Sequence, residues 1–338
     1  MYAAYFGLSK LPFTMTPDSR TLFLTAQHRE AVAGLAYAIL NRKGLLVLSG
    51  EVGTGKTTVL ARVLNFLPPE RVNLSIVRHP TLTPDEFIEM VMLDFGITPI
   101  PQSKAQRLLL LKEFLLDSQA KGRTAALIID EAHKLSREVM EEVRLLGNFD
   151  SGDQKLLQIV MAGQSELDEL LRREDLRQLK QRVAVRVTLE PLPPPEVESY
   201  IAYRWAQAGG NPEHPFSAAA IRDIYRWSRG IPRLINSICD NTLLLAFAEQ
   251  KTIVDADHVH HVAADLDLAM TASAEAPKMP LPVTRIPLAP PAAAPASQLA
   301  AAAPLMAKIH EIRVPEFCGG APERSSLWYR CAAKLGLA

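Results

Sequence analysis

The chain has 338 residues, which is enough for two domains and a further segment. Its 48% hydrophobic and 22% charged residues are ordinary for a globular protein, and no apolar stretch reaches the ~18 residues of a membrane span. The 37 basic and 37 acidic residues balance, so charge alone does not indicate binding to nucleic acid or anionic lipid. The three cysteines are irregularly spaced, which argues against a disulfide framework or zinc site. With no signal-peptide pattern at the start, we expect a cytoplasmic protein.

The first two-thirds of the chain alternate between strand and helix patterns. Residues 1–25 carry scattered aromatic residues and turn signals and form a separate N-terminal segment in this interpretation. Helical apolar spacing over 26–40 is followed by short apolar runs at 45–49, 73–77, 124–129, 156–161 and 183–189. These runs are apolar on both faces, which is typical of parallel strands covered by helices. We therefore predict an α/β domain over residues 26–192, built on a five-stranded parallel sheet flanked by helices.

In the last third of the chain, helical patterns follow one another without strand patterns between them. Helical spacing recurs over 194–208, 217–228, 231–248 and 256–264, with glycine-containing turns between the helices. This pattern predicts a small all-α domain over residues 193–268. Residues 269–338 are rich in alanine and proline, with eight prolines between Pro277 and Pro304. Such a composition cannot bury a core, so we expect a disordered linker and tail there.

A phosphate-binding loop directly follows the first predicted strand. Residues 50–58 read Gly-Glu-Val-Gly-Thr-Gly-Lys-Thr-Thr, which fits the P-loop pattern between a strand and a helix. Backbone N–H groups of such a loop surround a phosphate chain, the lysine reaches the β- and γ-phosphates, and the first threonine holds Mg²⁺. The expected nucleotide-binding residues are Gly50, Glu51, Val52, Gly53, Thr54, Gly55, Lys56, Thr57 and Thr58. The sequence therefore predicts a nucleoside triphosphate ligand.

Two adjacent carboxylates follow the third predicted strand. Asp130 stands at the tip of this apolar strand, where P-loop proteins place a ligand of the Mg²⁺ shell. Glu131 comes next and is a candidate general base that polarises the attacking water. The alternative is that the pair only caps the helix that follows. The P-loop upstream favours the catalytic interpretation.

Three further polar residues are candidates for the same site. Gln164 follows the fourth predicted strand and is a candidate for holding the water or contacting the γ-phosphate; alternatively this is an ordinary helix start. Arg182 lies in a basic run before the fifth strand and is a candidate for stabilising transition-state charge, unless the run is a solvated face. Arg233 follows Pro232 at a helix start of the second domain and is expected to project towards the nucleotide.

Taken in order, these motifs resemble those of the AAA+ ATPases over roughly residues 26–265. The resemblance implies that Gly50–Thr58 is Walker A, Asp130-Glu131 is Walker B and Gln164 is sensor 1. It further implies that Arg233 is sensor 2 and Arg182 the arginine finger, with Arg177 as the alternative. ATP, Mg²⁺ and a homo-oligomer follow as expectations.

The N-terminal sequence narrows the resemblance to one group of AAA+ ATPases. Tyr5-Phe6-Gly7-Leu8, Pro12-Phe13, Thr16-Pro17-Asp18 and Gln27-His28-Arg29-Glu30-Ala31 are similar to the general secretion pathway protein A ATPases, the ExeA-like group. The resemblance implies an ATPase that assembles or remodels a secretion, pilus or other envelope complex, cytoplasmic or peripheral at the inner membrane. Transposition ATPases are also relatives of this group, so the alternative is a DNA-associated regulator. A nucleotide-gated switch without turnover is a third hypothesis, which the Glu131 carboxylate disfavours.

Overall fold

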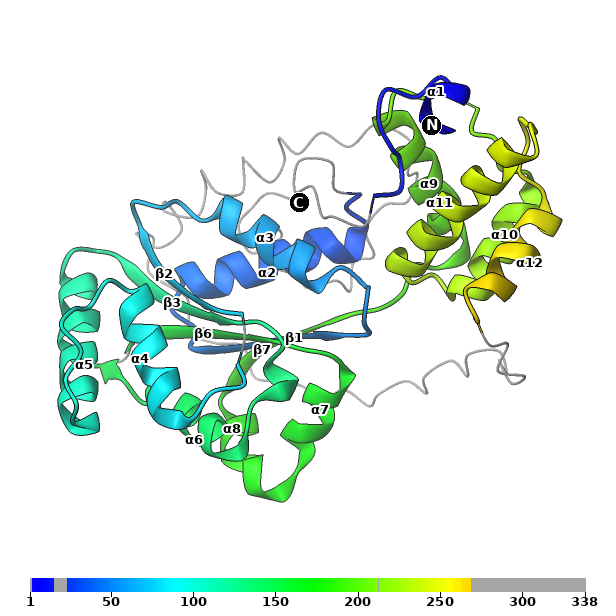
Figure 1. Ribbon diagram of the computed structural model, residues 1–338. Helices are drawn as coiled ribbons and strands as arrows, with labels where there is room; N and C mark the ends of the chain where they lie inside the picture. Colours follow the sequence, from blue (N-terminus) through cyan, green and yellow to red (C-terminus); the bar gives the residue numbers. More distant parts are fainter. Residues whose placement is uncertain (1, 15–22, 79, 153, 212, 269–338) are drawn as a thin grey trace, which may run out of the picture.

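The computed structural model describes residues 2–14, 23–78, 80–152, 154–211 and 213–268 (Figure 1). Helices lie at α1 Tyr2–Tyr5, α2 Ala26–Leu40, α3 Lys56–Phe66, α4 Pro84–Asp94, α5 Lys104–Ala120, α6 Arg137–Leu146, α7 Ser165–Arg172, α8 Arg177–Gln181, α9 Pro194–Gln207, α10 Ala218–Ser228, α11 Pro232–Ala248 and α12 Ala256–Asp265, with short 3₁₀ turns at η1 Ala132–Lys134 and η2 Glu174–Leu176. Strands lie at β1 Leu45–Gly50, β2 Val72–Val77, β3 Thr124–Ile129, β4 Asp150–Ser151, β5 Gln154–Lys155, β6 Leu157–Ala162 and β7 Val183–Leu189. The predicted tail, 269–338, lies outside the described residues.

Five of these strands form one parallel sheet in the order β2-β3-β6-β1-β7. The predicted five-stranded parallel sheet flanked by helices is therefore confirmed, with the fourth apolar run forming β6 one residue later than expected. The three central strands β3, β6 and β1 are buried along their whole length. The outer strands β2 and β7 are only partly buried, so the expectation of two apolar faces is wrong for them.

The alternation of side chains along the central strands divides the core into two layers. Leu46 and Leu48 point to the face covered by α2 and α3, whereas Leu45 and Val47 point to the face covered by α4 to α8 (Figure 1). Because both faces are covered by helices, the polar groups that can meet a ligand lie at the strand ends. The loops after β1, β3 and β6 all leave the sheet at its carboxyl edge, where open α/β sheets place ligands.

Helices α9 to α12 form a separate bundle with its own core (Figure 1). The N-terminal residues belong to this core, although they precede the sheet in the chain. Phe13 is 1% exposed and packs edge-to-face on Phe216, and the Tyr2 hydroxyl donates to Asp240 on α11. Arg204 on α9 donates to the carbonyl oxygens of Pro12 and Thr14. The chain thus begins in the helical bundle, crosses to the sheet at α2, and returns to the bundle at α9.

This packing predicts that the N-terminal segment stabilises the bundle. Replacing the buried Phe13 by alanine (F13A) is expected to lower the free energy of unfolding by about 3–5 kcal/mol, because it removes a fully buried ring and leaves a cavity. Urea denaturation monitored by circular dichroism measures the change. The matched control is Leu11→Ala, two residues away and 44% exposed, which is expected to stay within about 0.5 kcal/mol of wild type. Equal effects of the two substitutions would contradict this assignment.

Candidate functional site

The P-loop joins the end of β1 to the start of α3, and its glycines have backbone conformations that side chains rarely adopt. Gly53 and Gly55 have φ values of +87° and +100°, in the left-handed region that favours glycine. A Cβ on Gly53 would also lie 2.7 Å from Cβ of Arg233, at the start of α11. The loop is therefore packed directly against the helical bundle, and a side chain at Gly53 would push the two apart.

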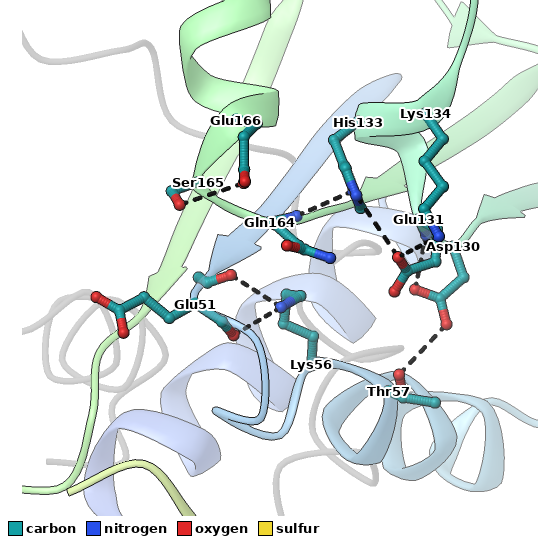
Figure 2. A network of polar contacts seen from close by, with 11 residues as sticks. Glu51, Lys56, Thr57, Asp130, Glu131, His133, Lys134, Gln164, Ser165 and Glu166 are labelled. Atoms are coloured by element: carbon teal, nitrogen blue, oxygen red, sulfur yellow. Dashed lines mark hydrogen bonds and ion pairs between the residues drawn. The ribbon is translucent and has the colours of Figure 1, made fainter. Parts of the chain in front are cut away.

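Lys56 is buried at the first position of α3. Its ammonium donates to the carbonyl oxygens of Gly50 and Glu51, at 2.8 Å each (Figure 2). Burial lowers the pKa of Lys56 from its ordinary value, while the nearby carboxylates of Glu131 and Asp130 act against that shift. The ammonium thus lies within the loop that the sequence predicts to hold phosphate, with negative charge on the opposite side of the site.

Thr57 and Asp130 meet across the gap between α3 and β3. The Thr57 hydroxyl donates to Oδ2 of Asp130 at 3.3 Å, and the backbone N–H of Glu131 donates to Oδ1 of the same carboxylate at 2.9 Å (Figure 2). Hydroxyl and carboxylate oxygens are the hard ligands that Mg²⁺ prefers. The donor set of these two residues therefore fits the predicted magnesium ion.

Glu131 has an unusual backbone conformation for a residue with a side chain. Its φ of +54° lies in the left-handed region, which costs roughly 1–3 kcal/mol in a residue that is not glycine. One carboxylate oxygen, Oε2, lies 3.3 Å from Nζ of Lys134 and 3.6 Å from Nε2 of His133. The strained backbone turns the Glu131 side chain towards the same space as Lys56 and Thr57 (Figure 2).

Gln164 lies in the loop between β6 and α7, so it falls between the P-loop and the Asp130–Glu131 pair. Its strand β6 pairs with β1 on one side and β3 on the other. The N–H of the preceding Gly163 donates to the carbonyl oxygen of Leu48 at 3.0 Å, which fixes this loop to β1. The side chain of Gln164 faces Lys56 and Glu131 in Figure 2.

Arg233 reaches the site from the helical bundle. Its N–H donates to the carbonyl oxygen of Gly53 at 3.3 Å, and its guanidinium is among the charges that lower the pKa of Lys56. The structure thus brings together at one edge of the sheet nearly all the residues that the sequence singles out: Gly50, Glu51, Val52, Gly53, Thr54, Gly55, Lys56, Thr57, Thr58, Asp130, Glu131, Gln164 and Arg233.

Arg182 is not part of this group. It precedes β7 and therefore lies at the amino edge of the sheet, opposite the P-loop. Its guanidinium donates to the carbonyl oxygen of Arg144 at 3.2 Å and to the side chain of Asn148. Arg177, the alternative, is exposed at the start of α8. Arg182 therefore does not lie beside the P-loop of its own chain.

His28 is a residue of the site that motif reasoning did not assign to it. It is 5% exposed beneath the P-loop, with Nδ1 2.7 Å from the Thr25 hydroxyl and Nε2 3.3 Å from the carbonyl oxygen of Thr54. The Thr54 carbonyl oxygen can only accept a hydrogen bond, so Nε2 of His28 carries a proton and donates to it. In the neutral ring Nδ1 is then unprotonated and accepts a hydrogen bond from the Thr25 hydroxyl. His28 thus connects the start of α2 to the P-loop.

Comparisons with known proteins agree with this geometry. Residues 39–171 match the family model described as AAA domain. Among solved structures, the fold is similar to Drosophila ORC bound to DNA (TM-score 0.59, 19% identity, 76% of this chain and 65% of that one). It is also similar to the ORC2 protein of Aeropyrum pernix (TM-score 0.54, 17% identity, 77% of this chain and 73% of that one). At such identities these likenesses concern the fold alone.

Residues 39–171 therefore carry an AAA domain, and the described residues have the fold of a P-loop NTPase. The chain is related to general secretion pathway protein A of Aeromonas hydrophila, with 39% identity over 250 residues. The match covers 73% of this chain and 45% of that relative, so the chain spans less than half of the relative's length. The resemblance of the N-terminal sequence to the ExeA-like group is thereby confirmed. No helix among the described residues is long and apolar enough to cross a membrane.

The environment of His28 predicts a pH dependence of stability. Burial, aided by the charge of Arg29, lowers the pKa of His28 below its ordinary value of 6.5. Between the lowered pKa of the folded chain and the ordinary pKa of the unfolded chain, the unfolded chain binds more protons than the folded one. Stability therefore rises with pH through that window and falls as the solution is acidified. Thermal unfolding from about pH 7 to about pH 5.5 is expected to show a steeper loss for wild type than for His28→Gln.

The buried hydroxyl partner of His28, Thr25, provides the control for this pH dependence. Thr25→Val removes the hydrogen bond to Nδ1 but keeps the titrating ring, so its stability should still fall on acidification. Parallel pH profiles for wild type and His28→Gln would contradict a buried neutral imidazole at this position.

Proposed function

We propose that the chain binds ATP with Mg²⁺ at this site and hydrolyses it. The observation that carries the proposal is the convergence of Lys56, Thr57, Asp130 and Glu131 at one edge of the sheet. These residues supply a phosphate-binding cation, two magnesium ligands and a general base, which together are what phosphoryl transfer to water requires. A phosphate-binding module without turnover would need no carboxylate at position 131.

Nucleotide binding would use the loop and the helix that follows it. The N–H groups of the P-loop and the positive end of the α3 dipole attract the phosphates. Lys56 would exchange its two carbonyl acceptors for oxygens of the β- and γ-phosphates. Thr57 and Asp130 would hold Mg²⁺, which neutralises charge on the phosphate oxygens when bound.

Hydrolysis would use Glu131 as the base. The carboxylate takes a proton from a water molecule as the water oxygen bonds to the γ-phosphorus, and the bond from that phosphorus to the bridging oxygen breaks. ADP leaves with the electron pair of the broken bond, and inorganic phosphate is the second product. Gln164, whose side chain faces Lys56 and Glu131, would hold the water or a γ-phosphate oxygen.

Coupling to movement would run through Arg233. Its backbone donates to Gly53, so a change in the P-loop on nucleotide binding or phosphate release acts directly on the start of α11. The helical bundle would then move against the sheet as a lid. In a homo-oligomer this movement would remodel a partner complex.

The relative named general secretion pathway protein A supports a partner in an envelope secretion or pilus apparatus, with the chain in the cytoplasm or at the inner membrane. The second candidate is a DNA-associated, transposition-type regulator, an alternative that the balanced charge does not favour. ATPase rates with and without duplex DNA separate the two, since a DNA-dependent enzyme is stimulated by the duplex and an envelope ATPase is not.

Two substitutions test the nucleotide site. Glu131→Gln removes the base but keeps the shape, so kcat for ATP hydrolysis is expected to fall about 100-fold or more with binding unchanged. Lys56→Ala removes a charged phosphate contact and is expected to weaken ATP binding by roughly 10- to 100-fold. Phosphate release and titration with a fluorescent ATP analogue measure these effects. Normal turnover by Glu131→Gln would show that the base is another residue.

A mixing experiment tests Arg182. Because this arginine lies at the opposite sheet edge, it can complete only the site of a neighbouring subunit, and Arg182→Ala is expected to lower kcat on the order of 100-fold. Mixing this protein with Glu131→Gln should restore part of the activity, since mixed interfaces pair an intact Glu131 with an intact Arg182. Arg177→Ala is the matched control. If no mixing ratio restores ATP hydrolysis, the site is not shared between subunits. If activity is restored by mixing Glu131→Gln with Arg177→Ala but not with Arg182→Ala, then Arg177 is the arginine that completes the neighbouring site.

A further inference from the structure

His133 connects two elements of the site that the motifs treat as independent. It lies in the 3₁₀ turn η1, directly after Asp130-Glu131-Ala132, and its side chain is 11% exposed. Nδ1 accepts a hydrogen bond from the backbone N–H of Gln164 at 3.3 Å (Figure 2). On the other side of the ring, Nε2 lies 3.6 Å from Oε2 of Glu131. The imidazole therefore stands between the candidate base and the loop after β6.

The first of these contacts determines where the ring carries its proton. Nδ1 accepts from an amide N–H, so it is unprotonated and the neutral ring carries its proton on Nε2. That N–H faces the Glu131 carboxylate, whose orientation it favours electrostatically. A change in the position of Gln164 would move the ring and, with it, the hydrogen that faces Glu131.

The surrounding backbone leaves the ring and the loop little freedom to move separately. A Cβ on Gly163 would lie 3.2 Å from the backbone nitrogen of His133 and 3.0 Å from the Leu167 side chain, so η1 and the start of α7 are tightly packed. Glu131 itself has a left-handed backbone that surrounding contacts must maintain. Its other partner, Lys134, has a 55% exposed side chain and no hydrogen bond to the Gln164 loop among the described contacts.

We propose that His133 is a positioning residue that links Glu131 to the Gln164 loop. In this role it holds the carboxylate in the orientation that accepts the proton from water, and it makes that orientation depend on the loop that meets the γ-phosphate. The proposal rests on the proposed ATP hydrolysis at Glu131. It adds a residue that touches neither nucleotide nor metal and that acts only through its two neighbours.

Substitutions that separate the two contacts test the proposal. His133→Ala removes both and is expected to lower kcat by about 10- to 100-fold, as for a misplaced catalytic group, with ATP affinity within about twofold of wild type. Asn at 133 can still accept from the Gln164 N–H in place of Nδ1, and Gln can still donate towards Glu131 in place of Nε2. Each single-contact variant, His133→Asn and His133→Gln, should therefore give a kcat between those of wild type and His133→Ala.

Lys134→Ala is the matched control, because Lys134 contacts the same carboxylate oxygen without reaching the loop. Its kcat is expected to stay within about threefold of wild type, as for an exposed ion pair. In a Glu131→Gln background, His133→Ala should cause no further loss, since the group that it positions is gone.

Several outcomes would overturn the link. These are a wild-type kcat for His133→Ala, a loss of ATP affinity that accounts for the fall in rate, an equal fall in Lys134→Ala, or full recovery by either single-contact variant. A failure of the proposed function looks different: wild type would show no ATP hydrolysis, or Glu131→Gln would hydrolyse at the wild-type rate. Melting temperatures of all variants show whether each protein is folded.

Discussion

The site depends on the parallel alignment of three buried strands, β1, β6 and β3. Their register pairs Leu48 with Ala162 and Met161 with Ile129, so all three strands end at the same level. Whatever follows each strand must therefore meet at one edge of the sheet: the P-loop, the Gln164 loop and the Asp130–Glu131 pair. Because side chains alternate between two covered faces, a shift of one residue in any strand would carry its apolar set to the wrong layer. The core thus fixes the geometry of the polar groups that it does not contain.

The helical bundle contacts this edge of the sheet directly. It contacts the P-loop where Arg233 meets Gly53, a contact that only a glycine permits. The bundle is also continuous with the sheet at two places along the chain, before α2 and after β7. Phe23, just before α2, packs edge-to-face on Tyr200 of α9, so the start of α2 and the P-loop both adjoin the bundle. His28 ties these two points together, since it lies at the start of α2 and bonds to Thr54.

Sequence patterns were sufficient for the features that are local or periodic. Apolar runs located the strands of the sheet, and the glycine spacing located the P-loop, because both depend on neighbouring residues. The partial exposure of β2 and β7 was missed because a run of apolar residues does not say which strands lie at the edges. The packing of Phe13 on Phe216, some 200 residues away in the chain, could not be predicted, since no local pattern encodes a contact of that separation. The roles of Glu131, Gln164, Arg182 and Arg233 stay predictions.

The two imidazoles illustrate what such a site demands beyond its motif residues. His28 and His133 each accept at Nδ1 from a neighbouring donor, and each therefore directs Nε2 towards an oxygen of the site, the Thr54 carbonyl in one case and the Glu131 carboxylate in the other. A left-handed glycine loop and a left-handed glutamate are both conformations that a chain leaves unless contacts hold it there. A rigid, two-sided hydrogen-bonding ring supplies such a contact with little conformational freedom of its own. Histidine is suited to both places because its two nitrogens differ in role once one of them has accepted a hydrogen bond.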